Sequence, residues 1–317
     1  MRTLDLQVNG FAGVDFNRDN LTAESLRHAC VAAREAGADQ ILATIITDSP
    51  EAMGRRLARL AELREADAVV REIIAGLHIE GPFLNPAPGY IGAHPVEHAC
   101  LASPELARRL TDAGGGLVKL VTLAPERDPG LAATRWLAGQ GITVSAGHCD
   151  TPLETLKAAA DAGLSMFTHV GNGCPQQLHR HDNIIQRALS LADRLWLCFV
   201  VDGTHVPPMA LANYWRAAGG LDRVIAVTDA ISAAGLGPGK FTLGAQTLEI
   251  GEDLIAWGPG KAHFVGSTAT MARIRKIAGD MGLAPEEISR ITAENPRRAL
   301  GLREEAGAGE REEIGPI

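Results

Sequence analysis

The chain has 317 residues, of which 46% are hydrophobic, and it carries a formal net charge of -8 at pH 7. Its length and apolar content suit one α/β barrel or two smaller domains. This charge comes from scattered Asp and Glu residues and argues against nucleic acid or an anionic membrane as the main partner, while a local basic pocket for a phosphate stays open. No run approaches the ~20 apolar residues of a membrane span, and the N-terminus lacks the apolar core of a signal peptide. We therefore expect a cytoplasmic enzyme without nucleic-acid or membrane partners.

Five cysteines are spread along the chain without a CxxC pair. Cysteines of this kind are expected to remain reduced thiols in a reducing compartment. Cys149 and Cys174 lie near the motifs described below, so a metal role for them is an alternative. The preferred interpretation is that they are small packing residues.

Eight short apolar segments predict buried strands of a parallel sheet, because both faces of each strand must be covered. In chain order they are LDLQVNG (4–10), QILATIIT (40–47), EIIAGLHIE (72–80), LVKLVTLAPE (117–126), GITVSAGH (141–148), LSMFTHV (164–170), RLWLCFVVDG (194–203) and RVIAVTDA (223–230). Helical segments lie between them at Thr22–Ala36, Pro50–Ala66, Pro104–Ala113, Pro152–Ala162 and Pro207–Ala218. Several open with Ser, Asp or Thr ahead of Pro or Glu, which is typical of a helix start.

Eight strands that alternate with helices predict a (β/α)8 TIM barrel over residues 1–301. A doubly wound sheet is the alternative, but it needs a GxGxxG turn after its first strand, and VNGFAGVDFN lacks that spacing. Between Lys240 and Phe264 the pattern alternates and predicts an inserted β-hairpin at 240–264. The polar segment 302–317 is expected to be a frayed C-terminal tail.

Polar and ionisable side chains stand at the C-terminal ends of the apolar runs. They are Gln7, Asn9, His78, Glu80, His148, His169, Asp202, His205 and Asp229. In a barrel these ends meet at one mouth, where the chemistry takes place. Two imidazoles and a carboxylate leave an open position on a tetrahedral ion, so Glu80, His148 and His169 are a candidate metal site. The alternative is that each is a hydrogen-bonded residue with no ligand.

Further candidates surround this set. His78 precedes Glu80 by two residues, so both face the same side of the strand, and His78 is a candidate for orienting a metal ligand. Asp229 is a candidate general base, with a helix-capping role as the alternative. Arg180 and His205, with Asn172 and the backbone of the GNG turn, are candidate anion contacts, although a loop arginine is usually solvated.

With these residues in place, the chain resembles the N-acetylglucosamine-6-phosphate deacetylase family of the amidohydrolase superfamily. Nine motifs in family order carry the resemblance: DLQVNGFAGVDF, GLHIEGPFLN, GAHP, VTLAPE, VSAGHCDT, THVGNG, VDGTHV, VTDAISAAG and VGSTATM. The resemblance implies one divalent metal ion per chain, held by Glu80, His148 and His169. Zn²⁺ is favoured, with Fe²⁺ or Co²⁺ as alternatives.

The resemblance also implies roles for residues around the metal. Asp229 would be the acid/base, and His94 of GAHP would polarise the acetamide carbonyl together with the metal. The implied substrate-binding residues are Asn172, Gly173, Arg180 and His205. Arg180 would bind the phosphate in a pocket completed across a homodimer interface.

The sequence departs from the family pattern in three places. Many amidohydrolases carry HxH on the first strand for a second metal, whereas this chain has Gln7, Val8 and Asn9, which favours a single metal. The small β-sandwich domain of the family has no counterpart in the sequence, so apolar barrel surface needs cover, and a homodimer is expected for this reason too. The loop THVGNGCPQQLHRHDN differs from the family's usual run, so phosphorylated and unphosphorylated substrates both stay open.

The expected reaction is hydrolysis of N-acetylglucosamine-6-phosphate to glucosamine-6-phosphate and acetate. The alternative is deacetylation of a different N-acyl sugar or of an N-acyl amino acid. A non-catalytic sugar-phosphate sensor is less favoured, because a sensor has no need for a general base beside a metal.

Overall fold

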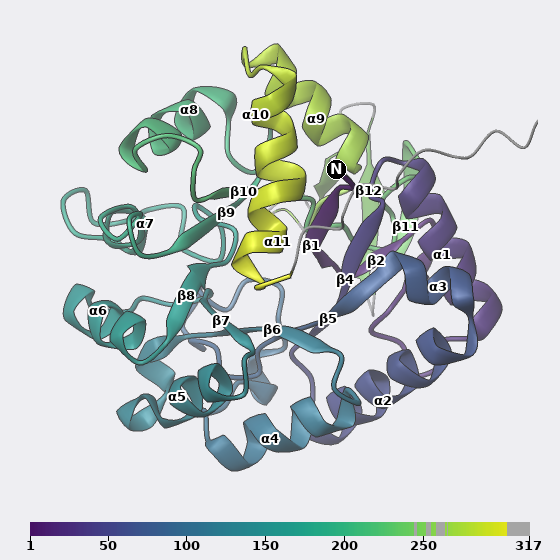
Figure 1. Ribbon diagram of the computed structural model, residues 1–317, viewed down its shortest axis with the longest axis horizontal. Coiled ribbons are helices and arrows are strands. Elements are labelled where there is room, and N and C mark those ends of the chain that lie inside the picture. Colours follow the sequence, from purple (N-terminus) through teal and green to yellow (C-terminus); the bar gives the residue numbers. More distant parts are fainter. Residues whose placement is uncertain (244–245, 252–254, 258–263, 265, 303–317) are drawn as a thin grey trace, which may run out of the picture.

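The computed structural model describes residues 1–243, 246–251, 255–257, 264 and 266–302. Its central sheet has eight parallel strands in the order β1-β4-β5-β6-β7-β8-β9-β10 (Figure 1). These strands are Leu4–Val8 (β1), Gln40–Ile46 (β4), Ile74–Glu80 (β5), Val118–Leu123 (β6), Thr143–Ala146 (β7), Leu164–Phe167 (β8), Trp196–Val200 (β9) and Val224–Val227 (β10). The predicted (β/α)8 barrel is confirmed, and its eight strands fall within the eight apolar runs.

The helices that connect the strands form an outer ring around them (Figure 1). They are Ala23–Glu35 (α1), Pro50–Ala66 (α2), Ala68–Ile73 (α3), Pro104–Ala113 (α4), Ala132–Gly139 (α5), Leu153–Asp161 (α6), Ile184–Leu189 (α7) and Pro208–Ala217 (α8). Three further helices follow the last barrel strand: Met271–Asp280 (α9), Pro285–Ser289 (α10) and Asn295–Ala299 (α11). Figure 1 shows α10 and α11 in front of the strands. Short 3₁₀ turns lie at Val96–His98, Pro125–Arg127 and Pro129–Leu131, and a π-helical turn at Arg290–Glu294 joins α10 to α11. Of the helices in the described residues, none is long and apolar enough to cross a membrane.

The predicted helix starts have a physical cause in the structure. The Ser49 hydroxyl accepts a hydrogen bond from the Ala52 amide, and Pro50 is the first residue of α2. Ser103 does the same for the Leu106 amide at the start of α4. A side-chain cap followed by proline satisfies amides that the first turn leaves without partners.

The barrel interior has an apolar end and a polar end. Apolar side chains of the strands fill the lower part, including Leu42, Leu120, Met166, Val200 and Ile225. Ala299 of α11 belongs to the same cluster, and Leu300 and Leu302 pack against it, so the C-terminal turn closes this end of the barrel. The polar side chains collect at the opposite, C-terminal end of the strands, which leaves that end for the functional site.

The first and last strands meet at a seam that a regular ladder does not span. Val8 and Ala230 form one isolated parallel bridge, in which the Asn9 amide donates to the Ala230 carbonyl at 2.7 Å. The other seven neighbouring pairs of strands are joined by ladders. Side chains therefore contribute to holding the barrel closed at this point.

Smaller sheets flank the barrel. Gly10–Phe11 (β2) and Val14–Asp15 (β3) form a short antiparallel pair directly after β1. Gly239–Leu243 (β11), Gln246–Ile250 (β12) and Ala256–Trp257 (β13) form an antiparallel sheet in the region where a hairpin was expected. The C-terminal tail predicted from residue 302 onward lies outside the described residues except for Leu302.

Candidate active site

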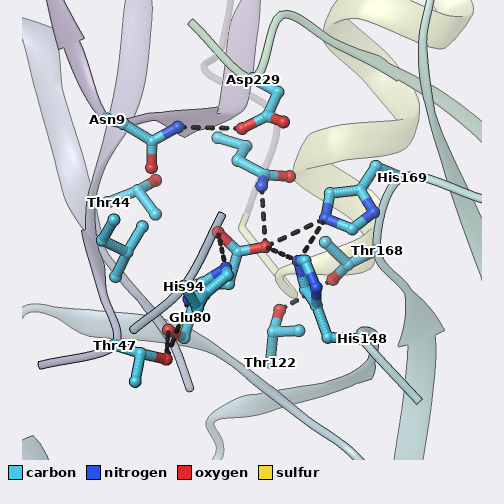
Figure 2. Close-up of polar contacts among 12 residues, drawn as sticks. Asn9, Thr44, Thr47, Glu80, His94, Thr122, His148, Thr168, His169 and Asp229 are labelled. Atoms are coloured by element: carbon cyan, nitrogen blue, oxygen red, sulfur yellow. Dashed lines mark hydrogen bonds and ion pairs between the residues drawn. The ribbon is translucent and has the colours of Figure 1, made fainter. Parts of the chain in front are cut away.

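The Glu80 carboxylate is the centre of the polar cluster at the barrel mouth (Figure 2). Glu80 ends β5, His148 follows β7 and His169 follows β8. Glu80 Oε1 lies 3.1 Å from His169 Nε2 and 3.3 Å from His148 Nε2, and the two Nε2 atoms are 3.1 Å apart. All three residues are buried. The structure therefore brings the three predicted metal ligands together.

The hydrogen bonds of the histidines show which ring nitrogens are available. His148 Nδ1 lies 2.7 Å from the Tyr90 carbonyl oxygen, so it donates to that oxygen, and Nε2 is the ring nitrogen that faces Glu80 and His169. His169 Nδ1 has no hydrogen-bond partner among the described residues. Two imidazole Nε2 atoms and a carboxylate oxygen thus converge on one small space.

Two imidazole nitrogens and a carboxylate oxygen this close together are a donor set that fits a divalent cation. Burial raises the pKa of Glu80, but hydrogen bonds from His148 and His169 outweigh it and hold this pKa well below its usual range. Burial lowers the pKa of His169, but the Glu80 carboxylate outweighs it and raises this pKa above its ordinary value. Positive charge is thus favoured between these groups, and a metal ion that binds there competes with protons for the same atoms. Two nitrogens and one carboxylate suit a divalent metal ion.

Two amides of β1 and its end support the carboxylates of the site. Gln7 Nε2 donates to Glu80 Oε1 at 3.0 Å, and Asn9 Nδ2 donates to Asp229 Oδ1 at 2.9 Å (Figure 2). Both side chains are committed to hydrogen bonds with carboxylates, so they orient these groups.

Asp229 lies in a buried environment that suits proton transfer. Burial raises its pKa to about 6, the charge of Glu80 acts in the same direction, and the Asn9 hydrogen bond acts in the opposite direction. A carboxyl group with a pKa near neutrality can both accept and release a proton during one reaction.

The residues after three strands share an unusual backbone conformation. His148, His169 and Asp229 have φ values of 51°, 30° and 52°. Non-glycine residues adopt positive φ at a cost of about 1–2 kcal/mol and do so mainly where function requires it. Here the left-handed turn at the end of each strand directs the side chain towards the mouth of the barrel.

His94 reaches the cluster from the loop after β5. Its Nδ1 lies 2.9 Å from Thr47 Oγ1, its Nε2 lies 3.9 Å from Glu80 Oε2, and its ring packs against His148 at a centroid distance of 4.4 Å. Burial lowers the pKa of His94 to about 3, and His148 acts in the same direction. The ring is therefore neutral and can act as a hydrogen-bond donor without carrying charge.

Two glycines allow the backbone to approach the histidines. A Cβ at Gly173 would lie 3.0 Å from both His148 Nδ1 and His169 Cε1, and a Cβ at Gly92 would lie 3.0 Å from His148 Cε1. Both glycines also have φ of 60°. Gly173 was predicted for substrate binding, and the structure places it directly against the metal-ligand candidates.

His78 lies one layer below the cluster. Its Nε2 is 2.8 Å from Thr122 Oγ1 and its Nδ1 is 3.4 Å from Thr44 Oγ1. The Thr122 hydroxyl is hydrogen-bonded to the Thr168 hydroxyl at 2.7 Å, and the Thr168 hydroxyl to the Ser145 hydroxyl at 2.6 Å. Burial lowers the pKa of His78 to about 4. Its ring bonds to hydroxyls rather than to the cluster itself, so any influence on Glu80 passes through β5.

The predicted substrate contacts lie further out. His205 Nδ1 bonds Asp202 Oδ2 at 2.6 Å, and the His205 ring packs against Phe264 at a centroid distance of 5.1 Å. Asn172 Nδ2 is buried without a partner among the described residues. Arg180 is exposed, and within the described part of the chain it makes no hydrogen bond or ion pair. The structure does not bring Arg180 into contact with the cluster.

Several residues of the site escaped the sequence analysis. Thr47 binds His94, and the Tyr90 carbonyl fixes His148. Glu126 binds the side chain of Asn85, the Asp150 amide and the Thr151 hydroxyl, which ties three loops together. Glu126 lies in VTLAPE, so its motif was visible although its role was not. A backbone carbonyl such as that of Tyr90 leaves no signal in a sequence.

Comparisons with known proteins agree on one family. The chain is 32% identical over 315 residues to N-acetylglucosamine-6-phosphate deacetylase of Homo sapiens, covering 96% of this chain and 75% of the human protein. It is 29% identical over 302 residues to N-acetylgalactosamine-6-phosphate deacetylase of Escherichia coli O157:H7, covering 94% of this chain and 77% of that protein. No protein-family model matches the chain.

Solved structures agree with the curated relatives. The crystal structure of N-acetyl-D-glucosamine-6-phosphate deacetylase from Mycobacterium smegmatis superposes with a TM-score of 0.84 at 30% identity, over 95% of this chain and 78% of that one. A mutant of the same enzyme, in complex with N-acetyl-D-glucosamine-6-phosphate, gives the same TM-score. The chain spans about three quarters of the length of these relatives.

A (β/α)8 barrel with a buried Glu-His-His cluster at its C-terminal mouth and a carboxylate beside it defines a hydrolase of the amidohydrolase superfamily. Sequence identity to the curated relatives selects one family within this superfamily. The chain belongs to the N-acetylglucosamine-6-phosphate deacetylase family.

Gly173→Ala tests whether close packing of the backbone on the histidines supports metal binding. The added methyl would press on His148 and His169, so we expect metal affinity to fall about 10–100-fold, as when groups that orient metal ligands are disturbed. Gly130→Ala is the matched control, because Gly130 has a φ of 62° and nothing within 4 Å of its Cβ position. Titration of the metal-free variants with Zn²⁺ measures the effect. Equal affinities in the two variants would contradict this account.

Proposed function

We propose that the protein hydrolyses N-acetylglucosamine-6-phosphate to glucosamine-6-phosphate and acetate. The observation that carries the proposal is the buried Asp229 carboxylate beside the Glu80–His148–His169 cluster, in a chain whose relatives are deacetylases of hexosamine phosphates. Amide hydrolysis needs an electrophile at the carbonyl and a group that moves a proton from water to the leaving amine. The cluster and Asp229 offer these two functions side by side.

The proposal includes one divalent metal ion per chain, with Zn²⁺ favoured. Glu80, His148 and His169 would hold it, and Gln7 and Asn9 are occupied with the carboxylates. When bound, such an ion supplies Lewis acidity that polarises an amide carbonyl and lowers the pKa of water.

Asp229 carries the proton through the reaction. As a carboxylate it takes a proton from the water that attacks the acetamide carbonyl, and a tetrahedral intermediate forms. As a carboxylic acid it returns the proton to the amide nitrogen, the C–N bond breaks, and acetate and the free amine leave. The raised pKa of about 6 favours both halves of this cycle near neutral pH.

His94 stabilises the oxygen that gains charge in the intermediate. In the tautomer whose Nδ1 accepts the Thr47 hydroxyl proton, Nε2 carries a hydrogen and faces the cluster. A neutral donor of this kind is worth about 3 kcal/mol at a developing oxyanion. The low pKa of His94 keeps the ring from competing for the proton that Asp229 carries.

The sugar end of the substrate would bind through Asn172, Gly173, His205 and Arg180. His205 is held by Asp202, so its Nε2 is presented in a fixed direction. The exposed guanidinium of Arg180 suits bidentate contact with phosphate oxygens. As part of the same proposal, a homodimer in the cytoplasm would complete the phosphate pocket with residues of the second subunit.

A second candidate substrate is N-acetylgalactosamine-6-phosphate, which differs at one hydroxyl. The 29% identity to the Escherichia coli N-acetylgalactosamine-6-phosphate deacetylase favours its inclusion. The acetamide and the phosphate are common to both sugars, so the residues named above do not separate them.

An amine-release assay tests the proposal. The panel contains N-acetylglucosamine-6-phosphate, N-acetylgalactosamine-6-phosphate, unphosphorylated N-acetylglucosamine and an N-acetyl amino acid. We expect turnover of the first, with about one metal ion per chain by elemental analysis. Bound metal with turnover of only an unphosphorylated compound would overturn the assignment of a sugar phosphate.

Asp229→Asn tests the proton carrier. The amide cannot accept the proton, so kcat should fall about 10²–10⁴-fold, the usual contribution of a general base. Metal content should stay at the wild-type level, because Asp229 is not among the proposed ligands. Turnover within a few-fold of wild type would remove Asp229 from the mechanism.

Arg180→Ala tests the phosphate contact. Loss of a charge-assisted hydrogen bond costs about 1.5–3 kcal/mol, so kcat/KM for the phosphorylated sugar should fall about 10–150-fold. Activity on an unphosphorylated analogue should be unchanged. Arg108→Ala, an exposed arginine of α4 on the outer ring, is the control. A parallel loss on both substrates would assign Arg180 to folding or assembly instead.

A further inference from the structure

A buried carboxylate at the barrel seam takes no part in the mechanism described above. Asp5 lies within β1, and its side chain is fully buried. It accepts hydrogen bonds from Thr228 Oγ1 at 2.5 Å, from the Thr228 amide at 3.2 Å and from the Gln7 amide at 3.3 Å. No cationic group contacts it among the described residues, so only three neutral donors offset its burial, which raises the pKa of Asp5 to about 7.

These bonds cross the one place where the barrel lacks a ladder. Asp5 belongs to the first strand, and Thr228 directly follows the last strand. The Thr228 hydroxyl is also 3.3 Å from the Gln7 carbonyl. The Asp5 carboxylate therefore bridges the seam where backbone hydrogen bonds are scarce.

Through Thr228 this bridge reaches the residue that moves the proton. Thr228 Oγ1 accepts a hydrogen bond from the Ala230 amide at 3.2 Å, so the hydroxyl spans the turn at Asp229. Asp229 has the left-handed φ of 52°, which needs support from its surroundings. Two backbone hydrogen bonds support it: the Asn9 backbone N–H donates to the Ala230 carbonyl, and the Ser267 backbone N–H donates to the Asp229 carbonyl.

Through Gln7 the same carboxylate reaches the metal-ligand cluster. The Gln7 amide bonds Asp5, and the Gln7 side chain bonds Glu80 Oε1. One buried side chain thus connects the backbone that positions Asp229 with the amide that orients Glu80.

We propose that Asp5 is a positioning residue that fixes Asp229 relative to Glu80 by clamping the seam between β1 and the segment after β10. The inference rests on the proposed function for its kinetic consequence. A displacement of about 1 Å between reacting groups can cost ~10²-fold in rate, so an open seam would lower turnover while the substrate still binds.

Asp128 provides a matched control elsewhere in the fold. It is also buried, with 4% of its surface exposed, and its carboxylate accepts from the Thr134 hydroxyl, the Thr134 amide and the Ala133 amide. It caps the start of α5 in the loop after β6, and its side-chain hydrogen bonds stay within residues 128–134, so it contacts neither the metal-ligand candidates nor Asp229. Removing either carboxylate takes the acceptor from one threonine hydroxyl and two backbone amides. The two variants therefore lose the same kinds of hydrogen bond at different positions in the fold.

The experiment compares Asp5→Ala and Thr228→Val with Asp128→Ala and Thr134→Val. We expect the two seam variants to lower kcat about 10–100-fold with KM within ~3-fold and with metal content unchanged. The helix variants should lose similar thermal stability and keep wild-type kcat. Thr228→Ser retains the hydroxyl and should restore turnover. Thr228→Val keeps the proposal testable if Asp5→Ala does not fold.

Amide hydrogen exchange gives a readout that does not depend on substrate. The seam variants should exchange faster at residues 228–231 and at Ser267, and the helix variants should not. If wild-type protein turns over none of the sugars, the proposed function fails, and amide hydrogen exchange alone then tests whether Asp5 holds the seam together. Unchanged exchange at the seam, or equal kcat in seam and helix variants, would overturn the role of Asp5.

Discussion

The site depends on the buried carboxylate of Glu80. Its Oε1 atom accepts a hydrogen bond from the Gln7 side chain of the first strand and contacts His148 and His169, which follow two later strands. A buried anion is costly unless donors surround it, so Glu80 needs donors from strands that are distant in the sequence. The barrel brings these donors together, because its parallel strands all end at one mouth. His94 and Gly173 then pack on the outer side of the same histidines.

Backbone conformation gives the cluster its direction. The chain leaves β7, β8 and β10 through left-handed residues, and each of these is a polar residue of the site. Two glycines with positive φ complete the surface at the points where a side chain would collide with an imidazole. The strain is therefore concentrated at the mouth, and the ladders and helices of the barrel supply the rigidity that maintains it.

The strands and the polar residues at their ends could be predicted because burial leaves a continuous apolar pattern that stops where the mouth begins. The starts of α2 and α4 could be predicted from their Ser-Pro pairs. Residues whose role depends on contacts between distant segments of the chain could not be predicted. Thr47 resembles any strand-end threonine, and Asp5 stands inside an apolar run without a motif of its own. α3 was missed because its residues continue into the apolar run of β5, and α7 follows a loop whose pattern is polar.

The closure of the barrel has a consequence for the order in which the chain can fold during synthesis. Asp5 bonds a residue 223 positions later, and Arg297 Nη2 bonds the carbonyl of Arg2 across 295 positions. The second edge of β1 therefore stays uncovered until residues 228–230 have been made. An unpaired strand edge is prone to wrong pairing, and here the acidic side chain within that strand makes a foreign apolar partner unfavourable during the wait.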